Sequence, residues 1–316
     1  MKYAIELDRV VWSPGDAFRL DELSLRVPRG SIYGFLGPNG SGKTSTVRLF
    51  MGMAKPTSGE IRVLDGLVPR DMPQILARVG YVPERPHVYP HLTVGEALRF
   101  HAAFHRLWDP HWADQLVERL GLDPSRKIAR MSKGEVGKLL VSLALAQRPE
   151  LLVLDEPTDG LDPVVRRDVM TTVLDYVSET GATVFISSHL VHELERICDW
   201  VGVMDRGSLV AELPMTDFKN GIKHLRVESA TPSTFAAAAV PALSDPPFVV
   251  LDRKPANGVS PYETWVVRGW TQDHADWFAD GPTRLRDVVD LDLEEGFVEL
   301  LRSQRSRAAL DLFDKD

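Results

Sequence analysis

The segment between residues 31 and 53 constrains the fold of this chain more than any other segment. An apolar run ends at Leu36, a glycine-rich turn follows, and the residues from Lys43 onward have the apolar spacing of a helix. The turn, GPNGSGKT, matches the pattern G-x-x-x-x-G-K-[ST], in which glycines let backbone N–H groups wrap around phosphates. In that pattern Lys43 reaches the β and γ phosphates, and Thr44 holds magnesium at the positive end of the helix. The sequence therefore predicts a nucleotide phosphate site formed by Gly37, Pro38, Asn39, Gly40, Ser41, Gly42, Lys43, Thr44 and Ser45.

Two adjacent carboxylates, Asp155 and Glu156, end a second apolar run, LLVLDE. This run and a third one, TVFISS, are typical of parallel strands that are buried on both faces. Two acids at the edge of a core are costly to bury without a functional reason. We therefore expect Asp155 to orient magnesium, and Glu156 to act as a general base that polarises the attacking water.

Two further segments lie where ligands bind in α/β folds. Ser132 and Glu135 lie at the start of a helix predicted to end at Gln147, where backbone N–H groups and a hydroxyl meet the positive helix end. In isolation, the same residues are better explained as a helix cap. His189 follows TVFISS at the sheet edge, and because histidine titrates close to neutrality it can bind a phosphate and sense its loss.

Composition and charge exclude several classes of protein. The chain has 316 residues, of which 44% are hydrophobic, which favours a folded protein of about two domains. Its apolar runs are shorter than the ~20 residues of a membrane-spanning helix, and its first residues lack the features of a secretion signal, so we expect a cytosolic protein. A net charge of −8 opposes broad binding to nucleic acid.

The single cysteine and most histidines are interpreted as structural residues. Cys198 has no second thiol for a disulfide, and we expect it to be a small buried hydrophobic residue. Metal-binding spacing is not evident among the histidines other than His189, which are His87, His91, His101, His105, His111, His192, His224 and His274.

The sequence between about residues 84 and 148 predicts a helical insertion in the α/β pattern. Thr93 and Glu96 match a capping box, and Asp109 followed by Pro110 matches a helix start. The segment 214–316 has a different character, with strands and helices in the order βαββαβ followed by a terminal helix over about 294–303. This order predicts a split-βαβ, ferredoxin-like α+β domain.

Together these segments resemble the motifs of one family. GPNGSGKT, GYVPE, MSKGE, LLVLDEP, DGLDP and the SSH before LVHELERICD are similar, in this order, to those of ABC transporter ATP-binding subunits. The resemblance covers roughly residues 1–213 and implies an α/β P-loop ATPase with a helical subdomain at about 84–148. The segment 214–316 would then be an accessory, regulatory or dimerisation domain. The segments YVPE, LTVGEAL, SKG and DGLDP are most similar to those of bacterial exporter ATPases of the drug and antibiotic branch.

The resemblance implies a paired ATPase. Two such domains would meet head to tail and hold two ATP molecules, each between the GPNGSGKT of one subunit and Ser132 and Gly134 of the other. Glu135 and Asp162 would also contact the partner's nucleotide, with Asp162 at the seam between the subunits. Whether the second ATPase subunit is another copy or a different chain stays open.

The resemblance also implies a metal site and a membrane partner. Lys43, Glu156 and His189 would be catalytic, and Mg²⁺ would lie near Thr44, Asp155 and Glu84. Closure on ATP binding and reopening after hydrolysis would drive a separate polytopic membrane subunit, which would hold this chain at the inner face of the membrane. A groove at about residues 86–104 would receive a helix of that subunit, with the natural contacts His87, Val88 and Tyr89, although a plain loop is an equal alternative.

Three features depart from the family pattern. Glu84 stands where glutamine is common and adds a negative charge next to the phosphates. Glu135 replaces the usual glutamine of the signature, and Lys133 replaces one of its glycines. For the aromatic residue that stacks on adenine, Trp12 is the candidate, although counting from the first strand puts Pro14 at that place.

Two other functions are compatible with these motifs. A soluble ABC ATPase would act on ribosomes or DNA, but such proteins usually carry two ATPase domains or a long coiled-coil insertion, and neither is evident here. Alternatively, the segment 214–316 would dominate the function by sensing a ligand or holding a dimer together, although fold alone does not fix function.

Overall fold

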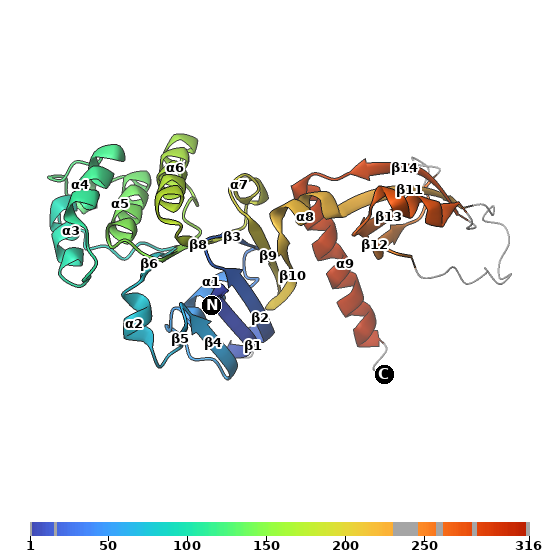
Figure 1. Ribbon diagram of the computed structural model, residues 1–316, viewed down its shortest axis with the longest axis horizontal. Coiled ribbons are helices and arrows are strands. Elements are labelled where there is room, and N and C mark those ends of the chain that lie inside the picture. The colour runs from blue at the N-terminus through green and yellow to red at the C-terminus, as the bar shows by residue number, and fades with distance from the viewer. Residues whose placement is uncertain (1, 16–17, 230–245, 257–261, 280–282, 314–316) are drawn as a thin grey trace. The chain divides into compact units, whose positions relative to one another are not determined.

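A computed structural model describes residues 2–15, 18–229, 246–256, 262–279 and 283–313 of the chain (Figure 1). The chain divides into two compact units, Met1–Glu212 and Leu213–Asp316, which are described separately below. Among the helices of the described ranges, none combines the length and apolar character that a membrane span requires.

The first unit is built on a six-stranded sheet with buried central strands. β3 (Ile32–Leu36), β7 (Leu151–Asp155) and β8 (Thr183–Ser188) are buried along their whole length, and β3 pairs with β8 and β8 with β7 in parallel. These are the apolar runs that were predicted as strands buried on both faces, and that prediction is confirmed. The sheet order is β10-β9-β3-β8-β7-β6, completed by β6 (Val79–Val82), β9 (Trp200–Asp205) and β10 (Ser208–Pro214).

A smaller antiparallel sheet packs on the other side of helix α1 (Lys43–Phe50). Its order is β2-β1-β4-β5, with the strands β1 (Tyr3–Gly15), β2 (Phe18–Pro28), β4 (Ser58–Val63) and β5 (Gly66–Leu67). Apolar side chains of both sheets and of α1 form one buried core, in which Phe185 contacts the rings of Tyr33, Phe35 and Phe50. The short helix α2 (Met72–Leu76) follows β5 along the chain. Burial from both sides explains why the central strands carry continuous apolar runs.

The helices of the predicted insertion are α3 (Val94–Ala102), α4 (Pro110–Arg119), the 3₁₀ turn η1 (Ile128–Arg130) and α5 (Lys133–Ala146), and they are followed by α6 (Pro163–Thr180) and α7 (Val191–Leu194). In the insertion, α5 packs against β6 on the face of the six-stranded sheet away from α1, and α3 and α4 pack against α5 beyond the β6 edge (Figure 1). The predicted caps are present, because the Thr93 side chain accepts from the backbone N–H of Glu96, and Asp109 accepts from that of Trp112.

The second unit contains an antiparallel four-stranded sheet of order β12-β13-β11-β14. Its strands are β11 (Ile222–Ser229), β12 (Val249–Lys254), β13 (Glu263–Arg268) and β14 (Thr283–Asp290), preceded by α8 (Met215–Gly221). The second predicted helix is a 3₁₀ helix, η2 (Gln272–Phe278), and the terminal helix α9 (Leu293–Phe313) is longer than expected. The first predicted helix, STFAAAAV, lies outside the described residues, so the ferredoxin-like arrangement stays a prediction.

Candidate active site

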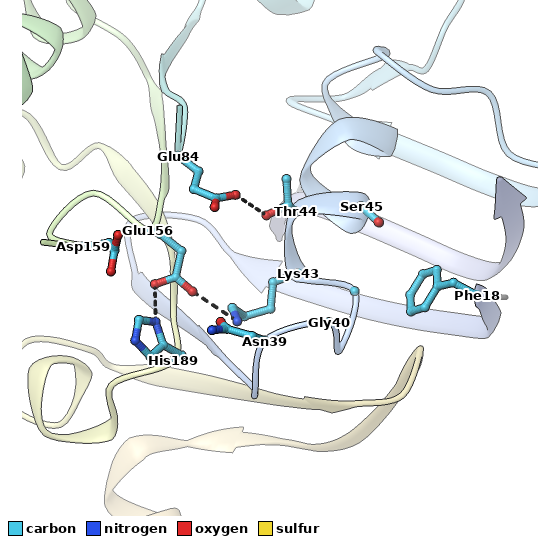
Figure 2. A pocket seen from close by; sticks show the side chains of 11 residues that line it. Phe18, Asn39, Gly40, Lys43, Thr44, Ser45, Glu84, Glu156, Asp159 and His189 are labelled. Atoms are coloured by element: carbon cyan, nitrogen blue, oxygen red, sulfur yellow. Dashed lines mark hydrogen bonds and ion pairs between the residues drawn. The ribbon is translucent and has the colours of Figure 1, made fainter. Parts of the chain in front are cut away.

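A cavity of about 520 Å³ lies at the glycine-rich loop between β3 and α1 (Figure 2). Its walls come from five parts of the first unit: the start of β2, the loop with α1, and the segments after β6, β7 and β8. The lining residues are Phe18, Asn39, Gly40, Gly42, Lys43, Thr44, Ser45, Glu84, Glu156, Asp159 and His189. Four of these segments follow the parallel strands β3, β6, β7 and β8, so the cavity lies at the carboxyl end of these strands, where ligands bind in such sheets.

The glycine-rich loop needs glycine at two positions for different reasons. Gly42 has a φ of 114°, which residues with a side chain rarely adopt, and its close neighbours include Phe18 and Leu20. At Gly37 the φ is ordinary, but a Cβ atom would lie 2.5 Å from the carbonyl oxygen of Met204. The loop is therefore locked between α1 and the strands, with its backbone N–H groups at the start of α1, where an anion is favoured.

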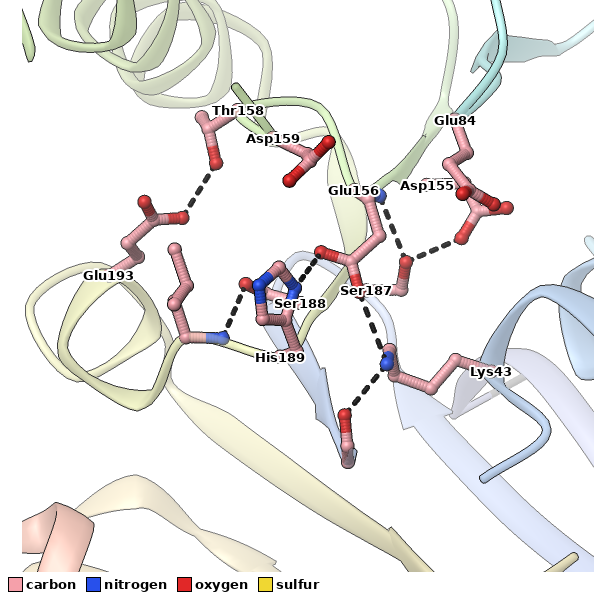
Figure 3. A network of polar contacts seen from close by, with 12 residues as sticks. Lys43, Glu84, Asp155, Glu156, Thr158, Asp159, Ser187, Ser188, His189 and Glu193 are labelled. Atoms are coloured by element: carbon pink, nitrogen blue, oxygen red, sulfur yellow. Dashed lines mark hydrogen bonds and ion pairs between the residues drawn. The ribbon is translucent and has the colours of Figure 1, made fainter. Parts of the chain in front are cut away.

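Lys43, Glu156 and His189 form one connected chain of polar contacts (Figure 3). Lys43 Nζ donates to the carbonyl oxygen of Gly37 at 2.7 Å and forms an ion pair with Glu156 Oε1 at 3.1 Å. The other oxygen of Glu156 lies 2.9 Å from His189 Nδ1. Lys43 and Glu156 are only 5% and 10% exposed, so neither charge is well hydrated. The three predicted catalytic side chains are therefore adjacent in the folded chain.

The backbone at Glu156 has an unusual conformation. Its φ of 48° lies in the left-handed region, which costs a residue with a side chain about 1–2 kcal/mol. The Glu156 backbone N–H donates to Ser187 Oγ at 3.0 Å and to the Ser187 carbonyl oxygen at 3.2 Å. The surrounding structure therefore holds this residue in a strained conformation, which is common at functional sites.

Oxygen atoms of three predicted metal ligands gather beside this chain of contacts. Thr44 Oγ1 lies 3.3 Å from Asp155 Oδ1 and 3.5 Å from Glu84 Oε2, and Ser187 Oγ donates to Asp155 Oδ1 at 2.5 Å. Asp155 Oδ2 is buried without a partner among the described residues. Burial raises the pKa of Asp155, an effect that the hydrogen bonds from Ser187 and Thr44 oppose.

The oxygens of Thr44, Asp155 and Glu84 suit Mg²⁺, which takes part of its ligands from water and substrate, better than a metal ion whose ligands all come from protein side chains. A group of three or more His, Cys, Asp or Glu side chains that could hold a metal is not found in the described ranges. Mg²⁺, however, is usually bound through one or two carboxylates, water and substrate phosphates. The unpartnered oxygen of Asp155 and the hydroxyl of Thr44 supply such a partial set next to the phosphate loop.

The residues predicted to contact a partner's nucleotide lie elsewhere and make local structural contacts. Ser132 and Glu135 form a capping box at the start of α5, and Glu135 also pairs with Arg126 at 2.6 Å. Asp162 caps α6 through the N–H groups of Val164 and Val165. Neither these residues nor Gly134 are among the residues that line the cavity. Within this chain, Ser132 and Glu135 therefore act as a helix cap.

The aromatic residue at the cavity is Phe18 rather than Trp12. Phe18 and His189 are the residues with rings among those that line the cavity. Trp12 instead pairs with Leu20 across the β1–β2 hairpin and packs against the core. Trp12 is not among the residues that line the cavity, and the residue that stacks on adenine stays a prediction. Register shifts in this hairpin change the positions of residues relative to the loop, so counting along the sequence did not find Phe18.

Cys198 agrees with its structural interpretation, and His101 and His105 contact each other. Cys198 is buried, and burial raises the pKa of its thiol strongly, so that it behaves as a small hydrophobic group. His101 and His105 stack on each other in α3 and the turn after it, and burial lowers the pKa of both.

The fold and the site define a P-loop ATPase cassette: a strand, a phosphate loop and a helix, with acids at the end of a neighbouring strand and a histidine after the next one. A family model described as ABC transporter matches residues 20–159. The bacitracin transport ATP-binding protein BcrA of Bacillus licheniformis is 37% identical over 65% of this chain and 68% of that protein. The chain therefore belongs to the ABC transporter ATP-binding proteins, whose domain binds and hydrolyses ATP.

Other relatives and solved structures agree. The Nod factor export ATP-binding protein I of Cupriavidus pinatubonensis is 34% identical over 66% of this chain and 65% of that protein. A solved ATP-binding subunit of an ABC transporter has a TM-score of 0.62 at 25% identity, covering 68% of this chain and 92% of that one. A dimeric ATP-binding cassette bound to ADP and Pi, at 20% identity and a TM-score of 0.60 over 67% of this chain and 98% of that one, shares the fold.

Proposed function

We propose that this protein is the ATP-hydrolysing motor of an ABC exporter that acts on a separate membrane subunit. The observation that carries the proposal is the contact of Glu156 with both Lys43 and His189 beside the phosphate loop. The names of the relatives support export, because they describe bacitracin transport and Nod factor export. The transported molecule would be selected by the membrane subunit.

In the proposed mechanism, nucleotide binding rearranges the buried charges. The phosphates of ATP offer Lys43 a stronger anionic partner than Glu156, which would free one oxygen of Glu156 to accept a proton from water. His189 would hold the other oxygen and orient the carboxylate. Mg²⁺ bound by Thr44 and Asp155, with Glu84 nearby, would neutralise charge that develops on the phosphates. Glu84 keeps an oxygen in the place of the common glutamine.

The second half of each ATP site would come from a partner ATPase subunit. Ser132 and Gly134 lie at the start of α5, where backbone N–H groups favour an anion, and they do not contribute to the cavity of their own chain. The extra negative charge of Glu135 is paired with Arg126 and with the Ser132 N–H, so it is directed into its own helix cap. This pairing supports a competent signature despite the substitution.

The membrane subunit would bind next to the segment of residues 86–104. Tyr89, Phe100 and Phe104, which we call the aromatic patch, are exposed by 52%, 41% and 71%, and their rings contact in sequence at 5.3 and 5.1 Å. His87 is also exposed, whereas Val88 is half-buried. Contiguous exposed aromatic side chains are typical of interaction sites. The aromatic patch therefore supports docking of an amphipathic helix of the membrane subunit. Such docking would place the protein at the inner face of the membrane.

Purification from solubilised membranes tests the proposed function. We expect the tagged chain to retain a polytopic membrane protein, and expect Tyr89→Ser/Phe104→Ser to lose it while keeping ATP binding. Val249→Ser, at an exposed position of the second unit, is the matched control. Recovery of ribosomal or DNA-repair proteins without a polytopic membrane protein would instead support the soluble ATPase alternative.

A role of the second unit in dimerisation or regulation is a separate proposal. Its four-stranded sheet has its own buried aromatic core, which includes Phe248, Trp265 and Phe278. Deleting residues 214–316 should therefore leave the cavity intact, and should change dimerisation or the regulation of ATPase activity. Unchanged dimerisation, ATPase rate and regulation would remove this proposal.

A further inference from the structure

Glu193 connects the segment that follows Glu156 with the segment that follows His189. It lies on α7, shortly after His189, and its side chain is only 11% exposed. Its Oε2 accepts a hydrogen bond from Thr158 Oγ1 at 2.6 Å, and its Oε1 forms an ion pair with Arg166 at 2.5 Å. Thr158 follows Glu156, and Arg166 lies in the first turns of α6. Figure 3 shows Glu193 facing Thr158 across the gap between the two segments.

The contact between Glu193 and Thr158 and the contact between His189 and Glu156 together form a closed ring of interactions. On one side His189 Nδ1 lies 2.9 Å from Glu156 Oε2, and on the other Glu193 holds Thr158. The short connections are themselves fixed, because the Asp159 N–H donates to the Glu156 carbonyl and the Leu190 N–H donates to Ser188 Oγ. The segment after β7 and the segment after β8 are thus joined at two places, one at the cavity and one behind it.

We propose that Glu193 is a positioning residue, which sets the placement of His189 against Glu156 through Thr158 and Arg166. This inference rests on the proposed roles of Glu156 and His189 in hydrolysis. A charge-assisted hydrogen bond in a nearly buried place is short and directional, so it restricts the movement of α7 relative to the Glu156 segment. Hydrolysis is sensitive to such placement, because a shift of about 1 Å can cost up to ~10²-fold in rate.

A purely structural ion pair would give a different result. It would lower the melting temperature, while the folded fraction of a variant would hydrolyse ATP at the normal kcat. A positioning role lowers kcat in the folded protein and leaves the KM for ATP almost unchanged, because neither Glu193 nor Thr158 is among the residues that line the cavity.

The test compares Thr158→Val, which keeps the shape but removes the hydroxyl, with Thr158→Ser, which keeps the hydroxyl. We expect the valine variant to lose about 10- to 100-fold in kcat with little change in KM, and the serine variant to recover most of that activity. Thr172→Val is the matched control, because Thr172 is also buried and its hydroxyl donates to the carbonyl oxygen of Asp168 within α6. If Thr158→Val does not fold, Glu193→Gln, which removes one of the two acceptors, is measured by the same criteria.

A second substitution separates this inference from the proposed function. In a His189→Ala background, Thr158→Val should cause little further loss, because the residue through which it acts is absent. Normal kcat for folded Thr158→Val or Glu193→Gln, or a full additional loss in the His189→Ala background, would overturn the positioning role. The proposed function fails in a different way, namely if Glu156→Gln hydrolyses ATP like the unmodified protein.

Discussion

Lys43 Nζ and Glu156 Oε1 form an ion pair at 3.1 Å, and both side chains are almost completely buried. The residue proposed to bind phosphate therefore neutralises the residue proposed to activate water. A buried pair of this kind is held by the attraction between its members, which offsets the cost of removing both charges from water. In the proposed mechanism, nucleotide binding would separate them, so that binding of ATP and release of the general base would become one event.

Replacement of Glu156 by glutamine should uncouple binding from hydrolysis. Glutamine keeps the shape but cannot accept the proton, so we expect hydrolysis to fall by at least ~10². ATP should bind at least as tightly, because Lys43 no longer has to leave a carboxylate, and the ATP-bound dimer should accumulate. Phosphate release, nucleotide titration and size-exclusion chromatography measure these effects. Glu179→Gln, on the exposed end of α6, is the control, and near-normal turnover of Glu156→Gln would refute the general-base role.

Replacement of Lys43 by alanine should affect both nucleotide affinity and stability. Removal of one member of a buried ion pair leaves the other charge uncompensated, which costs about 3–5 kcal/mol. The double variant Lys43→Ala/Glu156→Gln removes both charges and should regain part of that loss, although ATP binding stays weak. Urea unfolding of the four proteins without nucleotide gives the coupling free energy. Unchanged ATP affinity in Lys43→Ala would contradict the assignment of the phosphate loop.

The charge of Asp155 should lower the stability of the nucleotide-free protein. Burial raises the pKa of Asp155 above its value in the unfolded chain, so the folded state binds the proton more tightly. The ionised form therefore opposes folding at neutral pH, and this cost disappears as the pH falls below the unfolded value of about 3.9. We expect Asp155→Asn to stabilise the protein by on the order of 1 kcal/mol at pH 7, and by less as the pH approaches 4.

Magnesium and ATP should reverse the order of stability. The unmodified protein should gain more in melting temperature from Mg²⁺ with ATP than Asp155→Asn does, because the variant lacks the carboxylate that would bind the metal. Thermal unfolding at pH 7 and pH 4, with and without ligand, measures both effects. A variant that is less stable than the unmodified protein at pH 7 would show that Asp155 is already well compensated by Ser187 and Thr44.

Much of the first unit could be predicted because its signals are local. The continuous apolar runs of β3, β7 and β8, the glycine-rich turn, and the caps at Thr93 and Asp109 each depend on neighbouring residues in the sequence. The order of the motifs then brought Lys43, Asp155, Glu156 and His189 to one sheet edge, which is where the structure places them.

The features that were not predicted depend on contacts between distant segments. The ion pair between Lys43 and Glu156 and the ring through Glu193 arise only when β3, β7 and β8 lie side by side. The position of Phe18 depends on bulges in the β1–β2 hairpin, which have no clear sequence signal. In the second unit, the segment predicted as a helix forms the 3₁₀ helix η2, and its Phe278 packs against the distant residues Phe248 and Trp265.

Phe18, and not Trp12, should contribute to the binding of the adenine base. Phe18 lines the cavity next to the phosphate loop, on the side away from Glu156 (Figure 2). Stacking of a base on an aromatic ring contributes about 1–3 kcal/mol, so Phe18→Ala should weaken ATP binding by roughly 10-fold or more, and Phe18→Tyr should not. Trp12→Ala is the matched control: it removes a ring packed on the core, so it should lower stability more than ATP affinity. Equilibrium titration with a fluorescent ATP analogue, in parallel with melting curves, separates the two effects. Equal affinity of Phe18→Ala and the unmodified protein, with a large loss in Trp12→Ala, would return the adenine contact to Trp12.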